Sequence, residues 1–130
     1  MQIIFYKDIT MPELPEVETI KTAIQKQLKD ARILDVSVRN PNLRQKVPDD
    51  LPEKIKNKKI ISYKRIAKYI IINLEDNLSL IFHLGMSGRI RLSDTLGDLQ
   101  KHDHLVFKTT EGYMIYNDAR RFGVCLYSSS

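Results

Sequence analysis

The sequence predicts a mainly β protein, folded as an antiparallel sandwich or barrel, and three observations lead to that fold class. Most of the chain divides into short segments rich in apolar and β-branched residues. The spacers at 75–77 (Glu-Asp-Asn) and 110–112 (Thr-Glu-Gly) are short turn-formers of the kind that join antiparallel hairpins. No βαβ unit repeats, which disfavours a parallel sheet. The expected strands are 33–38, 60–66, 69–74, 78–84, 89–92, 104–108, 113–116 and 124–127.

Two helices are expected beside these strands. Residues 16–29 place Val17, Ile20, Ile24 and Leu28 three or four positions apart, which gives one apolar helical face. Pro15 is tolerated in a first helical turn, where acidic residues also complement the macrodipole. A shorter helix should follow Asp50, which with the glutamate three residues later resembles a capping pair.

Composition indicates one globular domain with a basic surface. The 130 residues carry 21 Lys+Arg against 16 Asp+Glu, a net charge of +5, which favours a polyanionic partner. Cys125 is the only cysteine, so the chain contains neither an internal disulfide nor a multi-cysteine zinc site. No apolar run reaches the length of a membrane span, and residues 1–10 lack the pattern of a signal peptide. We therefore expect a cytoplasmic protein.

The first candidate motif, residues 11–19, has a proline directly after a methionine. If translation starts at Met11 and that methionine is removed, Pro12 becomes an amino terminus with a secondary amine. Alpha-amino groups titrate near ~8, so this amine is substantially unprotonated near neutral pH and can attack a sugar C1′. The carboxyl of Glu13 could protonate the sugar ring oxygen as the base departs. The structural alternative is a proline-punctuated helix start with acids on the dipole.

The second feature is a basic stretch, 54–68, that holds seven Lys/Arg residues and no acid. Charge runs of this kind are usually the solvated face of a strand. Lys68 stands out because an apolar run follows it directly, which predicts a strand buried on at least one face. A lysine at such an edge can contact a phosphate or transfer a proton.

The third motif is a tight turn at 82–89, with two glycines three residues apart around Met86. Spacing alone favours a hairpin whose methionine packs in the core. The functional alternative is an apolar wedge that is pushed into a base stack.

Two further motifs contain His102 and the pair Arg120-Arg121. A strand puts the histidines of 102–104 (His-Asp-His) on one face only as a pair, so a metal site is not expected. The paired arginines precede Phe122 and a glycine, which resembles a loop that offers guanidinium groups to phosphates and a ring to bases.

Together these segments resemble the formamidopyrimidine-DNA glycosylase family. The motifs PELPEVET, RIAKY, HLGMSGR, KHDH and NDARRFG follow one another from residue 12 to residue 123, in the family's order and approximate spacing. The resemblance implies an antiparallel β-sandwich flanked by helices. It also implies a repair enzyme for oxidised purines that excises the base and then cleaves the strand by β- and δ-elimination.

The resemblance also implies a role for each matching residue. Pro12 would be the Schiff-base nucleophile, Glu13 the acid acting at the sugar, and Glu16 a second glutamate that organises the site. Lys68 would serve strand cleavage and phosphate contact. The duplex would be wedged, and the gap left by the flipped nucleotide filled, by Met86, Arg120 and Phe122. Phosphates would be contacted by His102 and Arg121.

The expected domain organisation is an extension at 1–10 that is absent from the mature protein, followed by a truncated amino-terminal catalytic domain at 11–130. The family's helix–two-turn–helix and zinc finger would lie beyond the chain, so no cofactor is expected within it. The expected partner is damaged double-stranded DNA, with no membrane, and the protein is expected to be a monomer. The alternative is a catalytically inactive remnant that folds and binds DNA weakly.

Overall fold

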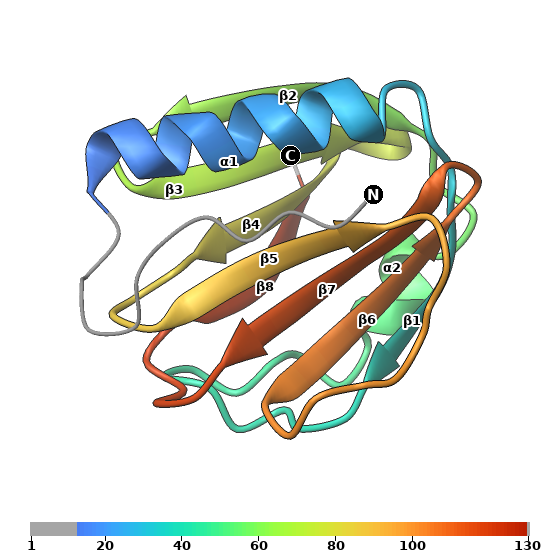
Figure 1. Ribbon diagram of the computed structural model, residues 1–130. Coiled ribbons are helices and arrows are strands. Elements are labelled where there is room, and N and C mark those ends of the chain that lie inside the picture. The colour runs from blue at the N-terminus through green and yellow to red at the C-terminus, as the bar shows by residue number, and fades with distance from the viewer. Residues whose placement is uncertain (1–12, 130) are drawn as a thin grey trace.

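The computed structural model describes residues 13–129, in which two four-stranded antiparallel sheets face each other (Figure 1). One sheet has the strand order β1-β6-β7-β5 and the other β2-β3-β4-β8. The strands are β1 (Ile33–Val38), β2 (Ile60–Ile66), β3 (Tyr69–Leu74), β4 (Leu78–His83), β5 (Gly88–Ser93), β6 (Asp103–Thr109), β7 (Gly112–Asp118) and β8 (Val124–Ser129). The helices are α1 (Leu14–Gln27), α2 (Leu51–Ile55) and the 3₁₀ turn η1 (Glu75–Asn77). The predicted antiparallel sandwich flanked by helices is confirmed.

Short turns join the neighbouring strands where the sequence predicts them. Strand β3 runs into β4 through η1, in which Asp76 and Asn77 have φ values of 63° and 61°. Aspartate and asparagine tolerate this left-handed conformation better than most residues, so the turn-forming character of the spacer has a direct structural cause. Strand β6 runs into β7 through a turn that ends at Gly112, whose φ is 120°.

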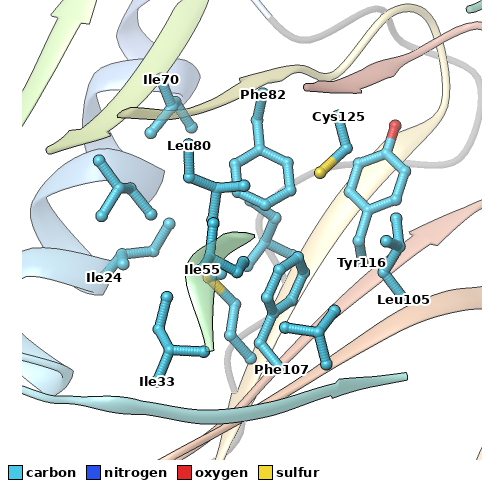
Figure 2. Close-up of a cluster of buried hydrophobic side chains, with 14 of the residues drawn as sticks. Ile24, Ile33, Ile55, Ile70, Leu80, Phe82, Leu105, Phe107, Tyr116 and Cys125 are labelled. Atoms are coloured by element: carbon cyan, nitrogen blue, oxygen red, sulfur yellow. The ribbon is translucent and has the colours of Figure 1, made fainter. Parts of the chain in front are cut away.

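Large apolar side chains fill the space between the sheets (Figure 2). The ring of Phe82, from β4, lies 5.7 Å from Phe107 of β6 and 5.9 Å from Tyr116 of β7, so it joins the two sheets at the centre of the core. Helix α1 lies alongside β2 and β3 and adds Ile20 and Ile24, both fully buried. Burying each such side chain stabilises the fold by roughly 1.5–3 kcal/mol.

The boundaries of α1 differ slightly from the prediction. The helix begins and ends two residues earlier than the predicted span of 16–29. Pro15 lies within the first turn, where its missing N–H would have had no intrahelical partner. Neither helix within residues 13–129 has the length and apolar character that a membrane crossing requires.

The helix α2 follows Asp50 as predicted, but the predicted capping by the Asp50 side chain is wrong. Asp50 precedes the helix, but its carboxylate accepts a hydrogen bond from the Tyr127 hydroxyl at 2.8 Å instead of capping the helix. Tyr127 lies 77 positions from Asp50 in the sequence, so local spacing could not have indicated this hydrogen bond.

The turns that carry the candidate motifs lie at one end of the sandwich. The start of α1, the β2–β3, β4–β5 and β7–β8 turns and the start of β6 all point to the left and lower left of Figure 1. This follows from antiparallel topology, because the end of one strand lies beside the start of its partner.

Candidate active site

The start of α1 holds two of the predicted acids. Glu13 is the N-cap residue, with extended backbone angles, and its N–H donates a hydrogen bond to the carboxylate of Glu16 one turn later. This bond satisfies a backbone donor and fixes the backbone of Glu13 relative to the helix. The Glu13 side chain is exposed and therefore available to a ligand. Pro12, which precedes it in the chain, lies outside the described residues.

Lys68 lies in the two-residue turn between β2 and β3 rather than within a strand. Its Nζ is 3.7 Å from the Oε2 of Glu13, which brings the predicted lysine and the predicted acid together. The strand that follows buries Ile70 and Ile72 on one face, as predicted. Ala67, the other turn residue, has a φ of 51°, so the reversal requires a left-handed backbone here.

Arg65 connects this turn to α1. Its Nε donates to the Oε1 of Glu18 and its Nη1 to the carbonyl of Ala67, both at 2.9 Å. Hydrogen bonds from Arg65 and from Lys21 hold the pKa of the Glu18 carboxyl below its usual value. The pair therefore fixes the residue before Lys68 relative to the helix that carries Glu13.

The β4–β5 turn, residues 84–87, presents Met86 to solvent. Its side chain is 42% exposed, so the core position favoured by spacing alone is wrong. The turn packs tightly against the β7–β8 loop: a Cβ at Gly85, whose φ is 59°, would lie 2.6 Å from the backbone carbonyl carbon of Phe122. Only glycine fits this position, because the backbone is left-handed and a neighbouring main chain occupies the space of a side chain.

The β7–β8 loop, residues 119–123, presents Arg120 and Phe122 beside Met86. Phe122 is 41% exposed, and the Arg120 guanidinium lies 5.0 Å above its ring centre, within cation–π range. Arg121 has a φ of 58° and directs its guanidinium the other way, where Nη1 donates to the carbonyl of Asn42 at 3.3 Å. Two adjacent arginines therefore serve two different surfaces.

His102 lies between these arginines, at the start of β6. It lines two neighbouring hollows of ≈ 480 Å³ each, one bordered by Arg121 and the other by Arg120. The adjacent Asp103 and His104 are buried and turned inward. Asp103 pairs with a buried arginine, and the Nε2 of His104 is 2.7 Å from the carbonyl of Asp118.

Basic side chains gather around the two hollows at the end of the sandwich that carries the turns. The hollows are lined in part by Arg39, Arg89, Lys101, His102, Arg120 and Arg121. Lys68 belongs to the same end of the fold. Such a surface attracts phosphates, with Arg presenting planar, paired donors and Lys a point charge.

The family model of the formamidopyrimidine-DNA glycosylase N-terminal domain matches residues 11–125. The chain belongs to this family. It is 47% identical over 119 residues to the formamidopyrimidine-DNA glycosylase of Rickettsia bellii (strain OSU 85-389), and 43% identical over 117 residues to that of Acinetobacter baumannii (strain SDF). These matches cover 91% and 90% of this chain but 43% and 42% of the relatives, so the chain spans less than half of their length.

Solved structures of the family share the fold. The Lactococcus lactis enzyme in complex with DNA containing FAPY-dG matches with a TM-score of 0.83 and 35% identity, over 91% of this chain and 44% of that one. The same enzyme in complex with DNA containing an abasic site matches equally well, with a TM-score of 0.83 and 35% identity. The strand order and the end-of-sandwich turns described above therefore belong to a fold that binds lesion DNA in those relatives.

The structure brings the predicted family residues together in two groups at this end. Glu13, Glu16 and Lys68 form one group, at α1 and the β2–β3 turn. The other group, at the β4–β5 turn, the β7–β8 loop and the start of β6, comprises Met86, His102, Arg120, Arg121 and Phe122.

Sequence reasoning missed His83 and Arg44. His83 ends β4 beside the first group: its ring contacts Tyr69 edge-on at 4.8 Å, and its Nδ1 accepts the N–H of Gly85 at 3.0 Å. Burial, Arg44 and Lys68 together lower the pKa of His83, so the ring favours its neutral form. His83 belongs to the motif HLGMSGR, which is a signal that could have found it. Arg44 lies in a loop outside every motif, and its N–H donates to the carbonyl of Gly123 at 3.1 Å.

The zinc of the family's finger finds no fitting ligand set among the residues that the structure describes. Within 13–129, no three His, Cys, Asp or Glu side chains gather as metal ligands. Cys125 is fully buried in the core, and this burial raises the pKa of its thiol, which disfavours the thiolate that zinc requires.

Proposed function

We propose that this chain is the catalytic half of a bifunctional DNA glycosylase and AP lyase that removes oxidised purines, formamidopyrimidines and 8-oxoguanine, from duplex DNA. The observation that carries the proposal is the 3.7 Å approach of the Lys68 ammonium to the Glu13 carboxylate, because Glu13 is bonded to Pro12. An acid and a lysine thus lie together on a basic surface, and the acid is the chain neighbour of the candidate amine. Family membership and relatives solved with lesion DNA support the same conclusion. Cytoplasmic location and a monomeric state stay predictions.

The first chemical step is attack by the Pro12 nitrogen on C1′ of the damaged nucleotide. The C1′–N bond to the base breaks, the base leaves with a proton from water, and an iminium joins Pro12 to the opened sugar. The Glu13 carboxylate takes the proton that the Pro12 nitrogen gives up and delivers it to the ring oxygen as the sugar opens. Glu16 holds the backbone of Glu13 through the N–H bond described above, and so helps to fix the acid at the start of α1.

The second step is elimination from the iminium. Loss of a C2′ proton expels the 3′ phosphate, and a further proton loss expels the 5′ phosphate, so each strand scission breaks one C–O bond. In this step Lys68 either stabilises a phosphate near the sugar or accepts a proton. Arg65 and Glu18 hold its turn against α1.

DNA engagement uses the second group of residues. Met86 and Phe122 offer exposed apolar surface that can enter the base stack, and Arg120 lies against the ring. His102 and Arg121 line a basic hollow suited to phosphates. Extrusion of a nucleotide costs a few kcal/mol, which contacts of this kind offset.

The amino terminus determines whether the chemistry is available. An internal Pro12 has an amide nitrogen with no free lone pair, whereas a chain that starts at Pro12 carries the secondary amine. The family match begins at residue 11, which supports Met11 as the start. An intact Met1 favours the competing hypothesis, an inactive remnant that binds DNA weakly.

Base release by a completed protein tests the proposal. Residues 12–130 are fused to the remaining length of the Rickettsia bellii relative, and free base from an 8-oxoguanine duplex is measured by mass spectrometry. We expect release from the lesion duplex and none from undamaged duplex, and a loss of ~10²-fold or more in Glu13→Gln. Glu53→Gln, an exposed acid on α2, is the matched control and should release base normally. Release that Glu13→Gln leaves unchanged contradicts the proposed role, and a folded fusion without any release favours the remnant.

A further inference from the structure

Asp118 ends β7 and is fully buried, and both oxygens of its carboxylate accept hydrogen bonds. Its Oδ1 accepts from the Ser87 hydroxyl at 2.6 Å and from the N–H of Arg121 at 3.0 Å. Its Oδ2 accepts from the Tyr116 hydroxyl at 2.7 Å and from the N–H of Gly123 at 2.9 Å. Four donors compensate the burial of a charge that would otherwise be strongly unfavourable.

These bonds connect segments that are far apart in the sequence. Ser87 belongs to the β4–β5 turn, and its Oγ also accepts the N–H of Arg120 at 3.0 Å, so one hydroxyl joins that turn to the β7–β8 loop. The backbone of Asp118 reaches a third segment, because its N–H donates to the carbonyl of His102 at 3.1 Å and its carbonyl faces the Nε2 of His104. Asp118 is thus the common partner of the three segments that carry Met86, the 120–122 side chains and His102.

An aspartate is required for this arrangement. A carboxylate offers two acceptor oxygens, whereas an asparagine amide has one acceptor oxygen and one donor nitrogen. With all four neighbouring groups donating, the amide nitrogen of Asp118→Asn would face two donors and leave them without an acceptor. One of the two lost bonds would fall on the loop backbone, because each carboxylate oxygen accepts one N–H group, from Arg121 or from Gly123.

We propose that Asp118 is a positioning residue that joins residues 84–87 and 119–123 into one rigid unit and so aims Met86 and Phe122 together at a gap in a base stack. This inference rests on the proposed function for its DNA partner. The rigid unit itself can be tested without DNA. The tips that it carries are exposed, while the carboxylate that supports them is buried.

Amide hydrogen exchange of residues 1–130, resolved by NMR, tests the rigid unit. Asp118→Asn should accelerate exchange at Arg121 or at Gly123, whichever N–H faces the new amide nitrogen, and Ser87→Ala should accelerate it at Arg120, each by ~10-fold or more, because a buried hydrogen bond is lost. Thr109→Ala is the matched control: its hydroxyl is equally buried and bridges the β6–β7 turn at the opposite end of the sandwich. It should leave the three loop amides within about 2-fold of wild type.

Exchange that stays at wild-type rates in the loop amides of Ser87→Ala and Asp118→Asn overturns the proposal. Should Asp118→Asn fail to fold, Ser87→Ala alone decides, since it removes one hydroxyl and leaves the carboxylate in place. Uniform acceleration throughout a folded Ser87→Ala also overturns the proposal, because it indicates global destabilisation rather than release of the loops.

The NMR signal of the Met86 methyl group tests whether the rigid unit directs Met86 into a gap in the base stack. At low salt, saturating duplex with a single abasic-site analogue should shift this signal by ring currents from the bases that flank the gap, while buried Met114 stays unchanged. We expect Thr109→Ala to show the full shift and Ser87→Ala and Asp118→Asn to lose at least half of it. A full shift in these two variants overturns the positioning role. A wild-type Met86 that does not shift overturns the wedge, whereas base excision is judged separately by the release assay.

Discussion

Removing one partner of the buried ion pair beside the candidate site should strongly destabilise the fold. The Nη1 and Nη2 atoms of Arg91 donate to the two carboxylate oxygens of Asp103 at 3.1 and 2.8 Å, and the two side chains are 8% and 0% exposed. Arg91→Met keeps the apolar stem and removes the charge. Breaking a buried pair by removing one partner costs about 3–5 kcal/mol. Asp103 keeps hydrogen bonds from the Gln100 N–H and the Asn117 amide, so we expect a loss near the lower limit, ~3 kcal/mol.

Urea unfolding followed by far-UV circular dichroism measures this loss, since the chain has no tryptophan. Lys108→Met, an exposed cation on β6, is the matched control and should change stability by no more than about 0.5 kcal/mol. The double variant Arg91→Met/Asp103→Leu should recover most of the loss, because it removes the uncompensated charge. A loss under ~1 kcal/mol, or a double variant no more stable than Arg91→Met, would refute the reasoning.

The same pair has a defined pH dependence. Burial alone would raise the pKa of Asp103, but hydrogen bonds from Arg91, the Gln100 backbone and Asn117 outweigh it and hold the pKa below the usual 3.8. Because the folded pKa is depressed, the stability from Asp103 is complete above 3.8 and is lost as the pH falls through the folded pKa. The deficit of Arg91→Met should therefore be largest near neutral pH and shrink in acid.

Three further predictions concern the site. Lys68→Ala in the completed protein should weaken strand cleavage or DNA binding by ~10-fold or more. The control is Lys56→Ala, which changes an exposed lysine beside α2 and should match wild type. Equal kinetics of the two variants would show that Lys68 is an ordinary surface lysine. Lys68→Ala should also raise the pKa of His83, seen by NMR titration of its ring, because one of the two cations that lower it is removed. The stability contributed by neutral His83 is complete above 6.5 and is lost as the pH falls through its folded pKa; an unchanged titration would contradict this electrostatic account. Residues 1–130 alone should bind duplex DNA with a Kd around 10⁻⁴–10⁻⁶ M at physiological salt, with little preference for 8-oxoguanine and strong salt dependence. Tight, lesion-selective binding would show that this half suffices for lesion recognition.

Local pattern predicted most of the strands because each carries its own signal. The strands Ile33–Val38, Ile60–Ile66 and Tyr69–Leu74 have the predicted bounds, since each is a short segment rich in apolar and β-branched residues. The other strands differ by one or two residues at an end, where pairing with a neighbour extends or shortens them. Asp50 shows the limit of local pattern, because its partner Tyr127 comes from β8.

The candidate site was predictable where a motif concentrates its chemistry in neighbouring residues. The proximity of Lys68 to Glu13 depends on the packing of α1 beside the β2–β3 turn, 55 positions apart, which spacing cannot reveal. The exposure of Met86 likewise follows from Gly85 packing on the backbone of Phe122. Asp118 was inconspicuous, because an acid ahead of two arginines resembles a loop residue and only the fold buries it.

Borohydride trapping tests the central claim, an amine nucleophile at Pro12, most directly. Two versions of the completed protein, one beginning at Pro12 and one at Met1, are incubated with 8-oxoguanine duplex and borohydride, which reduces an iminium to a stable covalent adduct. Denaturing electrophoresis and mass spectrometry then measure the adduct and locate it on the chain. The account predicts a covalent complex at Pro12 for the first protein and none for the second. Equal trapping of both versions, or an adduct on another residue, would contradict it.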